Sequence, residues 1–254
     1  MNTKVVFSVA AIAAVFTGSQ VMAQVTVKED GQWRSAVSLG VSSASGNSSS
    51  SSLSFLGDGV RATKQDKWSI YGSALYGRAS GTTTANILRL GTRYDWNLSE
   101  KLFAFGGLDL EKDGVAKLSL RTGLSGGLGY HVIKDANTTF DVFGGIGYTS
   151  DSYGVARFID NSNRTSYSYM NLVLGEESTH KLSETLSAKQ RFVFYPNMSN
   201  RGEYLARFDA GLSAAFSKSS NVTMGLAVRQ NSDPGVGVKK TDSFFTVGLG
   251  MKFD

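Results

Sequence analysis

Apolar and polar residues alternate along most of the chain beyond residue 32. The clearest example is the last segment, where Thr246, Gly248, Gly250 and Lys252 occupy one face and the apolar residues occupy the other. A period of two is typical of a β-strand whose two faces meet different surroundings. The apolar set of this segment consists of Phe245, Val247, Leu249, Met251 and Phe253.

The same alternation predicts about twelve strands; ten is the alternative count, because Tyr71 and Leu75 blur the pattern in that part of the chain. Strands of roughly 9 to 14 residues are long enough to cross a bilayer when tilted, and are about twice the mean strand length of soluble proteins. The predicted ranges are 34–42, 50–60, 68–77, 85–98, 102–111, 117–132, 139–150, 167–177, 185–195, 204–217, 221–231 and 242–253.

The connections between these segments alternate between short and longer ones. Bacterial membrane barrels join their strands by short periplasmic turns and longer outer loops. The short turns fall at 63–66, 99–101, 134–137, 178–183 and 218–220, and the longer connections at 43–49, 78–84, 112–116, 151–166, 196–203 and 232–241. We therefore predict an all-β fold, an antiparallel up-and-down transmembrane β-barrel.

Aromatic residues at strand ends agree with this fold. Trp68, Trp96, Phe140, Phe216 and Phe253 all fall at the predicted periplasmic ends. Aromatic side chains gather where a bilayer meets water. The sequence therefore predicts a girdle at the periplasmic interface.

Charged residues indicate which face of each strand lines the interior. An Arg or Lys facing lipid at mid-bilayer costs about 2–4 kcal/mol, so charges belong on the inner face. The expected inward side chains are Arg34, Arg89, Arg93, Asp95, Asp109, Arg121, Lys189, Arg191, Arg207, Asp209 and Arg229. They suggest either a basic constriction for small anions or a barrel filled by paired charges.

The first residues predict export. Residues 1–4 carry a positive charge, 5–16 are apolar, and Val21-Met22-Ala23 fits a signal peptidase site, so 1–23 is a predicted cleaved signal peptide. Its apolar stretch is too short to span a bilayer as a helix. We expect a short periplasmic segment at 24–31 and the barrel at 32–254.

Composition narrows the function further. The net charge is +5, but no Lys/Arg cluster is longer than Lys239-Lys240, so nucleic-acid binding is not expected. The chain has no Cys and only two His, which leaves no zinc pattern, and no metal or cofactor is predicted. A mean hydropathy of −0.13 suits strands that hide polar residues inside a barrel.

One motif suggests a serine hydrolase. Gly123-Leu124-Ser125-Gly126-Gly127 matches G-x-S-x-G, and His131 follows it. That motif needs a sharp turn from a strand into a helix, whereas Ser125 lies within alternating residues. We therefore expect no catalytic residue and no enzyme, with a membrane-embedded hydrolase as a remote alternative.

Several short motifs together resemble the family of salt-induced outer membrane proteins, a barrel family of unknown function. The similarity covers nearly all the predicted mature chain and implies an outer membrane location, with no substrate or catalytic residue. It departs at the end, because such chains usually finish on an aromatic residue, whereas here Asp254 follows Phe253. The motifs are Trp33, Leu39-Gly40-Val41, Ser45-Gly46-Asn47, Thr84-Ala85-Asn86, Tyr94, Leu98-Ser99, Gly127-Leu128-Gly129-Tyr130 and Thr241-Asp242.

The sequence thus predicts a bacterial outer membrane barrel, with a narrow passive channel for small solutes as the leading function. A closed barrel with a structural or envelope-stress role is the alternative. The expected partners are membrane lipid, small solutes and the barrel-insertion machinery, which would recognise the apolar face of residues 245–253.

Overall fold

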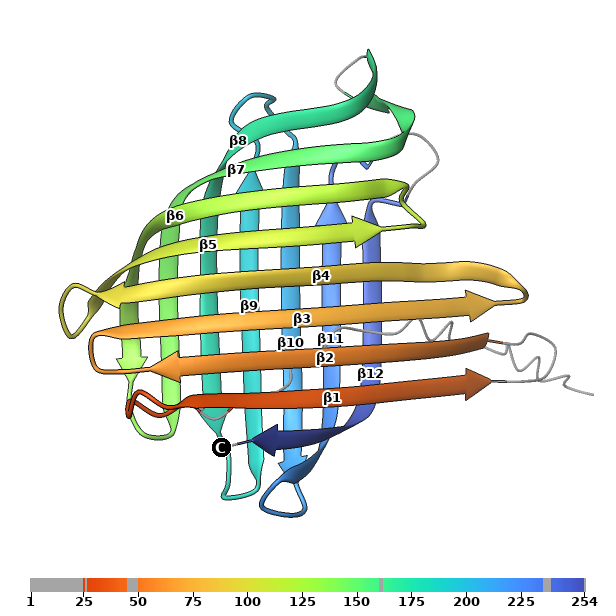
Figure 1. Ribbon diagram of the computed structural model, residues 1–254. Coiled ribbons are helices and arrows are strands. Elements are labelled where there is room, and N and C mark those ends of the chain that lie inside the picture. Colours follow the sequence, from red (N-terminus) through yellow and green to blue (C-terminus); the bar gives the residue numbers. More distant parts are fainter. Residues whose placement is uncertain (1–24, 26, 45–49, 160–161, 235–238, 254) are drawn as a thin grey trace, which may run out of the picture.

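Twelve antiparallel strands form one closed barrel, in which each strand pairs with its neighbours in the chain and β12 pairs with β1 (Figure 1). This computed structural model describes residues 25, 27–44, 50–159, 162–234 and 239–253. The strands are β1 (Trp33–Ala44), β2 (Ser50–Ala62), β3 (Asp66–Ala79), β4 (Thr82–Asn97), β5 (Leu102–Asp113), β6 (Leu118–Lys134), β7 (Thr138–Ile159), β8 (Ser162–Lys181), β9 (Leu186–Pro196), β10 (Tyr204–Ala215), β11 (Ser220–Asn231) and β12 (Thr241–Phe253). The predicted fold class and the higher strand count are confirmed.

Figure 1 shows the near wall of the barrel, β1 to β5, crossing the far wall, β9 to β11, at a steep angle. Strands of a closed barrel tilt against its axis, so opposite walls cross in this way. The end of β12 and the segment before β1 lie at the same end as the turns after β2, β4 and β6. We refer to this end as periplasmic, as in bacterial barrels of this class.

The outer face is apolar, as a lipid-facing surface must be. Leu39, Leu90, Leu128, Ile146 and Leu249 are each at least half exposed, on five strands around the barrel. Because every backbone group in a closed barrel is paired within the sheet, such a surface can face hydrocarbon. The chain is therefore a transmembrane β-barrel of the outer membrane type.

Two outer connections differ from the prediction. The expected loop at 151–166 is largely strand, because β7 and β8 continue outward to Ile159 and from Ser162. Polar residues had suggested a loop, but here the backbone pairs across the hairpin, as at Ser152 with Ser166 and Phe158 with Asn163. The expected loop at 78–84 is instead a tight turn, with Ser80 and Gly81 at φ of 48° and 81°, as in a two-residue hairpin.

The seam between β1 and β12 is short and strongly curved. Only Ser35 to Leu39 pair with β12, opposite Phe253 to Leu249. The hydroxyls of Ser38 and Thr223 lie 3.0 Å apart, although β12 runs between their strands. This approach is open because Gly248 is opposite, where a Cβ would lie 2.8 Å from the carbonyl oxygen of Leu39.

The predicted signal peptide, residues 1–23, lies outside the described residues. Among the described residues, no helix is long and apolar enough to span a membrane.

Candidate functional site: the charged barrel interior

Four arginines converge on one carboxylate toward the outer end of the barrel. Glu111, near the end of β5, lies 2.9 Å from Arg207, 3.1 Å from Arg89, 3.8 Å from Arg121 and 3.9 Å from Arg229. These strands lie on opposite sides of the barrel, so the side chains meet across its interior. We call the five residues, with Asp109 and Asp151, the outer ring.

The remaining carboxylates of the outer ring bind the same arginines from the sides. Asp109 lies 3.6 Å from Arg89 and 3.8 Å from Arg207, and it accepts a hydrogen bond from the hydroxyl of Tyr71. Asp151, only 2% exposed, pairs with Arg121 at 2.5 Å. The outer ring therefore holds four guanidinium groups against three carboxylates, and the carboxylate of Asp209 also acts on Arg89 and Arg229.

A second group of charges lies nearer the periplasmic end. Arg93 pairs with Asp95 at 2.6 Å, and Lys67 pairs with Asp95 at 3.2 Å. On the opposite wall, Glu177 accepts a hydrogen bond from Arg191 at 3.0 Å and forms an ion pair with Lys189 at 3.6 Å. We call these six residues the periplasmic cluster; it has more basic than acidic groups.

Aromatic rings enclose the guanidinium of Arg93. Its central carbon lies 4.3 Å from the ring centroid of Phe143 and 4.4 Å from that of Phe105, and Phe103 is 5.8 Å away. A cation over an aromatic face is attracted by the ring quadrupole. The rings hold Arg93 in one position and narrow the barrel at this level.

The N-terminal segment crosses the periplasmic mouth. Near β1, Asp30 receives two hydrogen bonds from Arg34, of 2.6 and 2.8 Å, and Gly31 donates to the carbonyl of Ala62 at 2.8 Å. Glu29 pairs at 3.0 Å with Lys134 of β6, five strands away around the barrel. We call the described residues of 25–31 the mouth strap, and Figure 1 places it beside the turn between β6 and β7.

Two further contacts fix the mouth strap. Val25 packs against Ala36 and Leu56, which are buried on the inner face. The hydrogen bonds from Arg34, followed by the one from the backbone of Gln32, hold the pKa of Asp30 well below its ordinary value. A carboxylate that is stabilised in this way remains charged at neutral pH.

Little space remains inside the outer ring. A cavity of about 30 Å³ lies between Glu111, Arg121, Tyr195 and Arg207, and another of about 20 Å³ lies outward of it, beside Asp151. Each holds about one water molecule. In this conformation, a solute larger than water passes only if the arginine side chains move.

The inner face thus holds all the charged side chains that the sequence placed there, and Asp209 lies on it near Asp58. The sequence did not anticipate that Asp151 belongs to this face, because it was assigned to the loop. Glu177 lay at the end of a predicted strand. Glu177 and Asn171 are an even number of positions apart on β8, so the alternation of faces would have placed these two on the inner face.

The two hydrolase candidates do not meet. Ser125 and His131 lie on the same extended strand, six residues and therefore about 20 Å apart. His131 instead lies 2.7 Å from Asp141 and 3.2 Å from Asn97. These two residues do not form a nucleophile and base pair.

One known protein family matches most of the chain. It matches, over residues 37–253, the model of a family described as "Protein of unknown function, DUF481". The chain belongs to this family. The match spans the barrel from β1 to β12, and its description assigns no activity and does not mention salt.

Solved structures with a similar arrangement are outer membrane barrels of several kinds. They include an outer membrane channel from Pseudomonas putida F1, 13% identical (94% of this chain, 97% of that one, TM-score 0.47). The NanC porin is 10% identical, with 85% of this chain and 97% of that one covered and a TM-score of 0.46. The translocator domain of the autotransporter NalP from Neisseria meningitidis is 10% identical, with 87% of each chain covered and a TM-score of 0.46. Likeness at this level extends to barrel architecture alone. A search of curated proteins gave no significant match.

Proposed function

We propose that this protein is a narrow passive channel for small anionic solutes in the bacterial outer membrane. The observation that supports this function is the outer ring, where Arg89, Arg121, Arg207 and Arg229 converge on Glu111 across the barrel. Rings of basic side chains at a constriction favour anions by electrostatic attraction. The outer ring would act as the selectivity filter.

The periplasmic cluster extends this path. An anion leaving the outer ring would next meet Lys189, Arg191 and Arg93, whose carboxylate partners are fewer. The outer ring and the periplasmic cluster would then provide two successive weak binding sites for an anion, and conduction requires such sites. The small cavities predict a low conductance, because the arginine side chains must move for each passage.

Recording from purified protein in planar bilayers tests this proposal. We expect small current steps and, under a KCl gradient, a reversal potential that shows preference for chloride. Arg207→Gln should lower this preference and Glu111→Gln should raise it. Lys112→Gln is the control, because Lys112 is exposed at the outer end of β5. Absence of steps above the detergent background would contradict the channel.

A second candidate function is a closed barrel with a structural role, including the salt-induced envelope role that the family resemblance implies. The observation in its favour is the close pairing of the buried charges, such as Arg121 with Asp151 at 2.5 Å. In that case, substitutions in the outer ring would lower stability but would not change permeability.

We also propose that β12 carries the signal for the insertion machinery.

A further inference from the structure

The lipid-facing side of β1 to β5 contains an apolar groove of about 490 Å³. Its walls are the outward side chains of Val37, Ile70, Leu90, Leu108 and Leu110. The volume falls within the range of about 300–1,000 Å³ that is usual for small-molecule sites. The groove lies on the outside of the barrel and is separate from the charged interior.

Glycines form the floor of this groove. Gly57, Gly59 and Gly72 face outward at adjacent positions of β2 and β3, because Gly57 pairs with Gly72 and Gly59 with Ile70. A Cβ on Gly57 would meet no atom closer than 3.8 Å, so a side chain there would point into the groove. Ile70 leans over Gly59 and Leu90 over Gly72, where a Cβ would lie 2.8 and 3.1 Å from them, so the open floor of the groove lies at Gly57.

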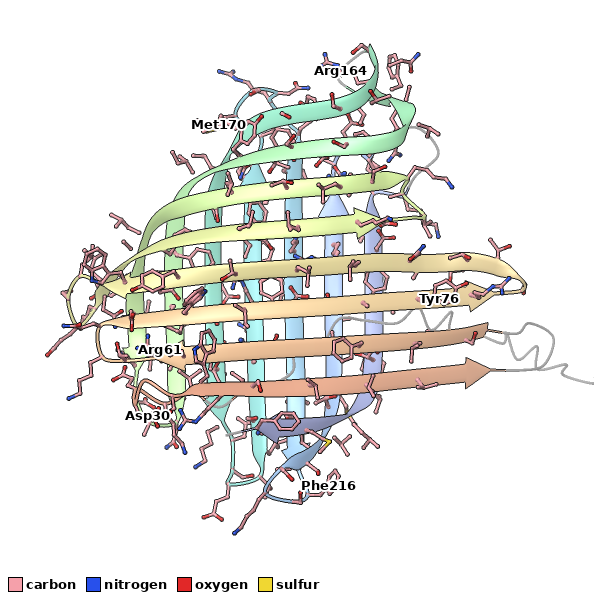
Figure 2. The ribbon with its side chains drawn as sticks, in the orientation of Figure 1. Asp30, Arg61, Tyr76, Arg164, Met170 and Phe216 are labelled. Carbon is pink, nitrogen blue, oxygen red and sulfur yellow. The ribbon has the colours of Figure 1, made fainter. Side chains whose placement is uncertain are left out.

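A row of polar and aromatic side chains borders the groove on its periplasmic side. Cross-strand pairing places Trp33, Arg61, Trp68 and Tyr94 side by side on the outer face of β1 to β4. The rings of Trp33 and Trp68 lie 5.7 Å apart. Figure 2 shows Arg61 at the end of the barrel where Asp30 lies, with Tyr76 at the opposite end. This is the level at which phospholipid headgroups meet an aromatic girdle.

Both signs of charge are present in this row. The side chain of Arg61 is about one third exposed and that of Asp66 one fifth exposed, and their charged groups lie 3.6 Å apart. The hydroxyls of Tyr94 and Thr63 donate to Asp66 at 2.9 and 2.5 Å and fix its position. Arg61 is held as well, because its Nε donates to the carbonyl of Gly31 at 3.2 Å. The two partly exposed groups can therefore bind a ligand that carries both charges.

We propose that this surface is a binding site for one ethanolamine phospholipid. An acyl chain occupies the glycine-floored groove, the phosphate binds Arg61, and the ammonium binds Asp66 between the aromatic rings. In this arrangement the zwitterionic headgroup lies at the charged pair, and the acyl chain lies in the apolar groove, deeper in the membrane. The site is distinct from the charged interior, since the side chains that would bind the lipid lie on the outer face.

Native mass spectrometry of the delipidated barrel, titrated with phosphatidylethanolamine in mild detergent, tests the site. We expect one tightly bound lipid per barrel. Arg61→Gln should weaken its binding roughly tenfold by removing a charged hydrogen bond. Gly57→Leu should abolish it, because the new side chain fills the groove. Phosphatidylglycerol, which lacks the ammonium, should bind more weakly, and Asp66→Asn should remove that difference.

Matched controls separate this site from general lipid association. Arg78→Gln removes an exposed arginine at the other end of β3, and Gly144→Leu adds a leucine to an outward glycine of β7, where a Cβ meets only ordinary contacts of 3.6 Å and above. Both should bind lipid as the wild type does. Equal binding by wild type, Arg61→Gln and Gly57→Leu would overturn the site, and equal binding of the two lipids by the wild type would overturn the assignment of ethanolamine. Heat-dependent gel mobility confirms that each variant is folded.

Discussion

Arg121 and Asp151 form a two-pronged ion pair inside the barrel, with hydrogen bonds of 2.6 Å from Nε and 2.5 Å from Nη2. Their strands, β6 and β7, are adjacent, and the two residues face each other in the register. Both side chains are almost fully buried, at 11% and 2% exposure. Since the hydroxyl of Tyr153 also donates to Asp151 at 2.9 Å, this carboxylate is well satisfied.

Removing one partner of this pair should be costly. We expect Arg121→Met to destabilise the barrel by about 3–5 kcal/mol, because it leaves a buried carboxylate without its cation. The double variant with Asp151→Leu should recover most of that loss, since no unpaired charge remains. Denaturant unfolding in detergent micelles measures both. Equal destabilisation of the single and double variants would show that the pair is not the cause.

Detaching the mouth strap should open the periplasmic end. Glu29→Gln removes the attachment to Lys134, a pair that is about 40% exposed on each side and therefore weak. Asp30→Asn removes the stronger attachment to Arg34. We expect the double variant to raise single-channel conductance, with heat-dependent gel mobility showing that the barrel is still folded. Lys28→Gln, a change at an exposed residue of the same segment, is the control and should conduct like the wild type.

The attachment at Asp30 predicts a specific response to pH. Because Arg34 lowers the pKa of Asp30 below its ordinary 3.8, this attachment is complete above that value and is lost only as the pH falls toward the lowered pKa. The chain has no native Cys. Spin labels at Val27→Cys and Ser99→Cys should therefore give the same narrow distance distribution at pH 7, pH 5 and pH 3, and a broad one only at still lower pH, where Asp30 becomes protonated. Asp30→Asn should already broaden it at pH 7; a narrow distribution in that variant would contradict the role of Asp30.

The fold was predictable because each strand has two faces that meet different media. Alternation was clearest where lipid and the interior differ most, as in β12. Tyr71 and Leu75 blurred the pattern because both face inward: Tyr71 donates to Asp109, and Leu75 is buried against the opposite wall. Where the inner face is partly apolar, the two faces of a strand differ less and the alternation is weaker.

The arrangement of the site was less predictable. Alternation indicates that Arg207 and Glu111 face inward, but they are 96 residues apart, and their contact depends on the curvature of the closed barrel. The same applies to the mouth strap, whose ion pair joins Glu29 to Lys134. The sequence predicts which face a residue occupies, and barrel closure determines which residues meet.

Two inward glycines allow β6 and β7 to curve. Gly127 pairs with Gly145, and a Cβ on Gly127 would lie 2.6 Å from the Cα of Gly145 and closer still to the carbonyl oxygen of Gly144. We expect Gly127→Ala to destabilise the barrel by about 1–3 kcal/mol through overpacking. Gly106→Ala, where a Cβ meets nothing within 4 Å, should cost little. Comparable losses for both, measured by unfolding in micelles, would contradict this explanation.

The last strand should be essential for insertion, because β12 is the only connection between β11 and β1. Without it, two edges with unpaired backbone groups would face lipid, and each unpaired group costs several kcal/mol. Deletion of residues 245–254 should therefore abolish heat-modifiable mobility on a gel. Removal of Asp254 alone leaves Phe253 in place and should preserve it. Phe253→Ala should slow insertion more than Val247→Ala, which removes a similarly exposed apolar side chain within the same strand. A truncated barrel that still resists unfolding in detergent would show that β12 is dispensable for closure.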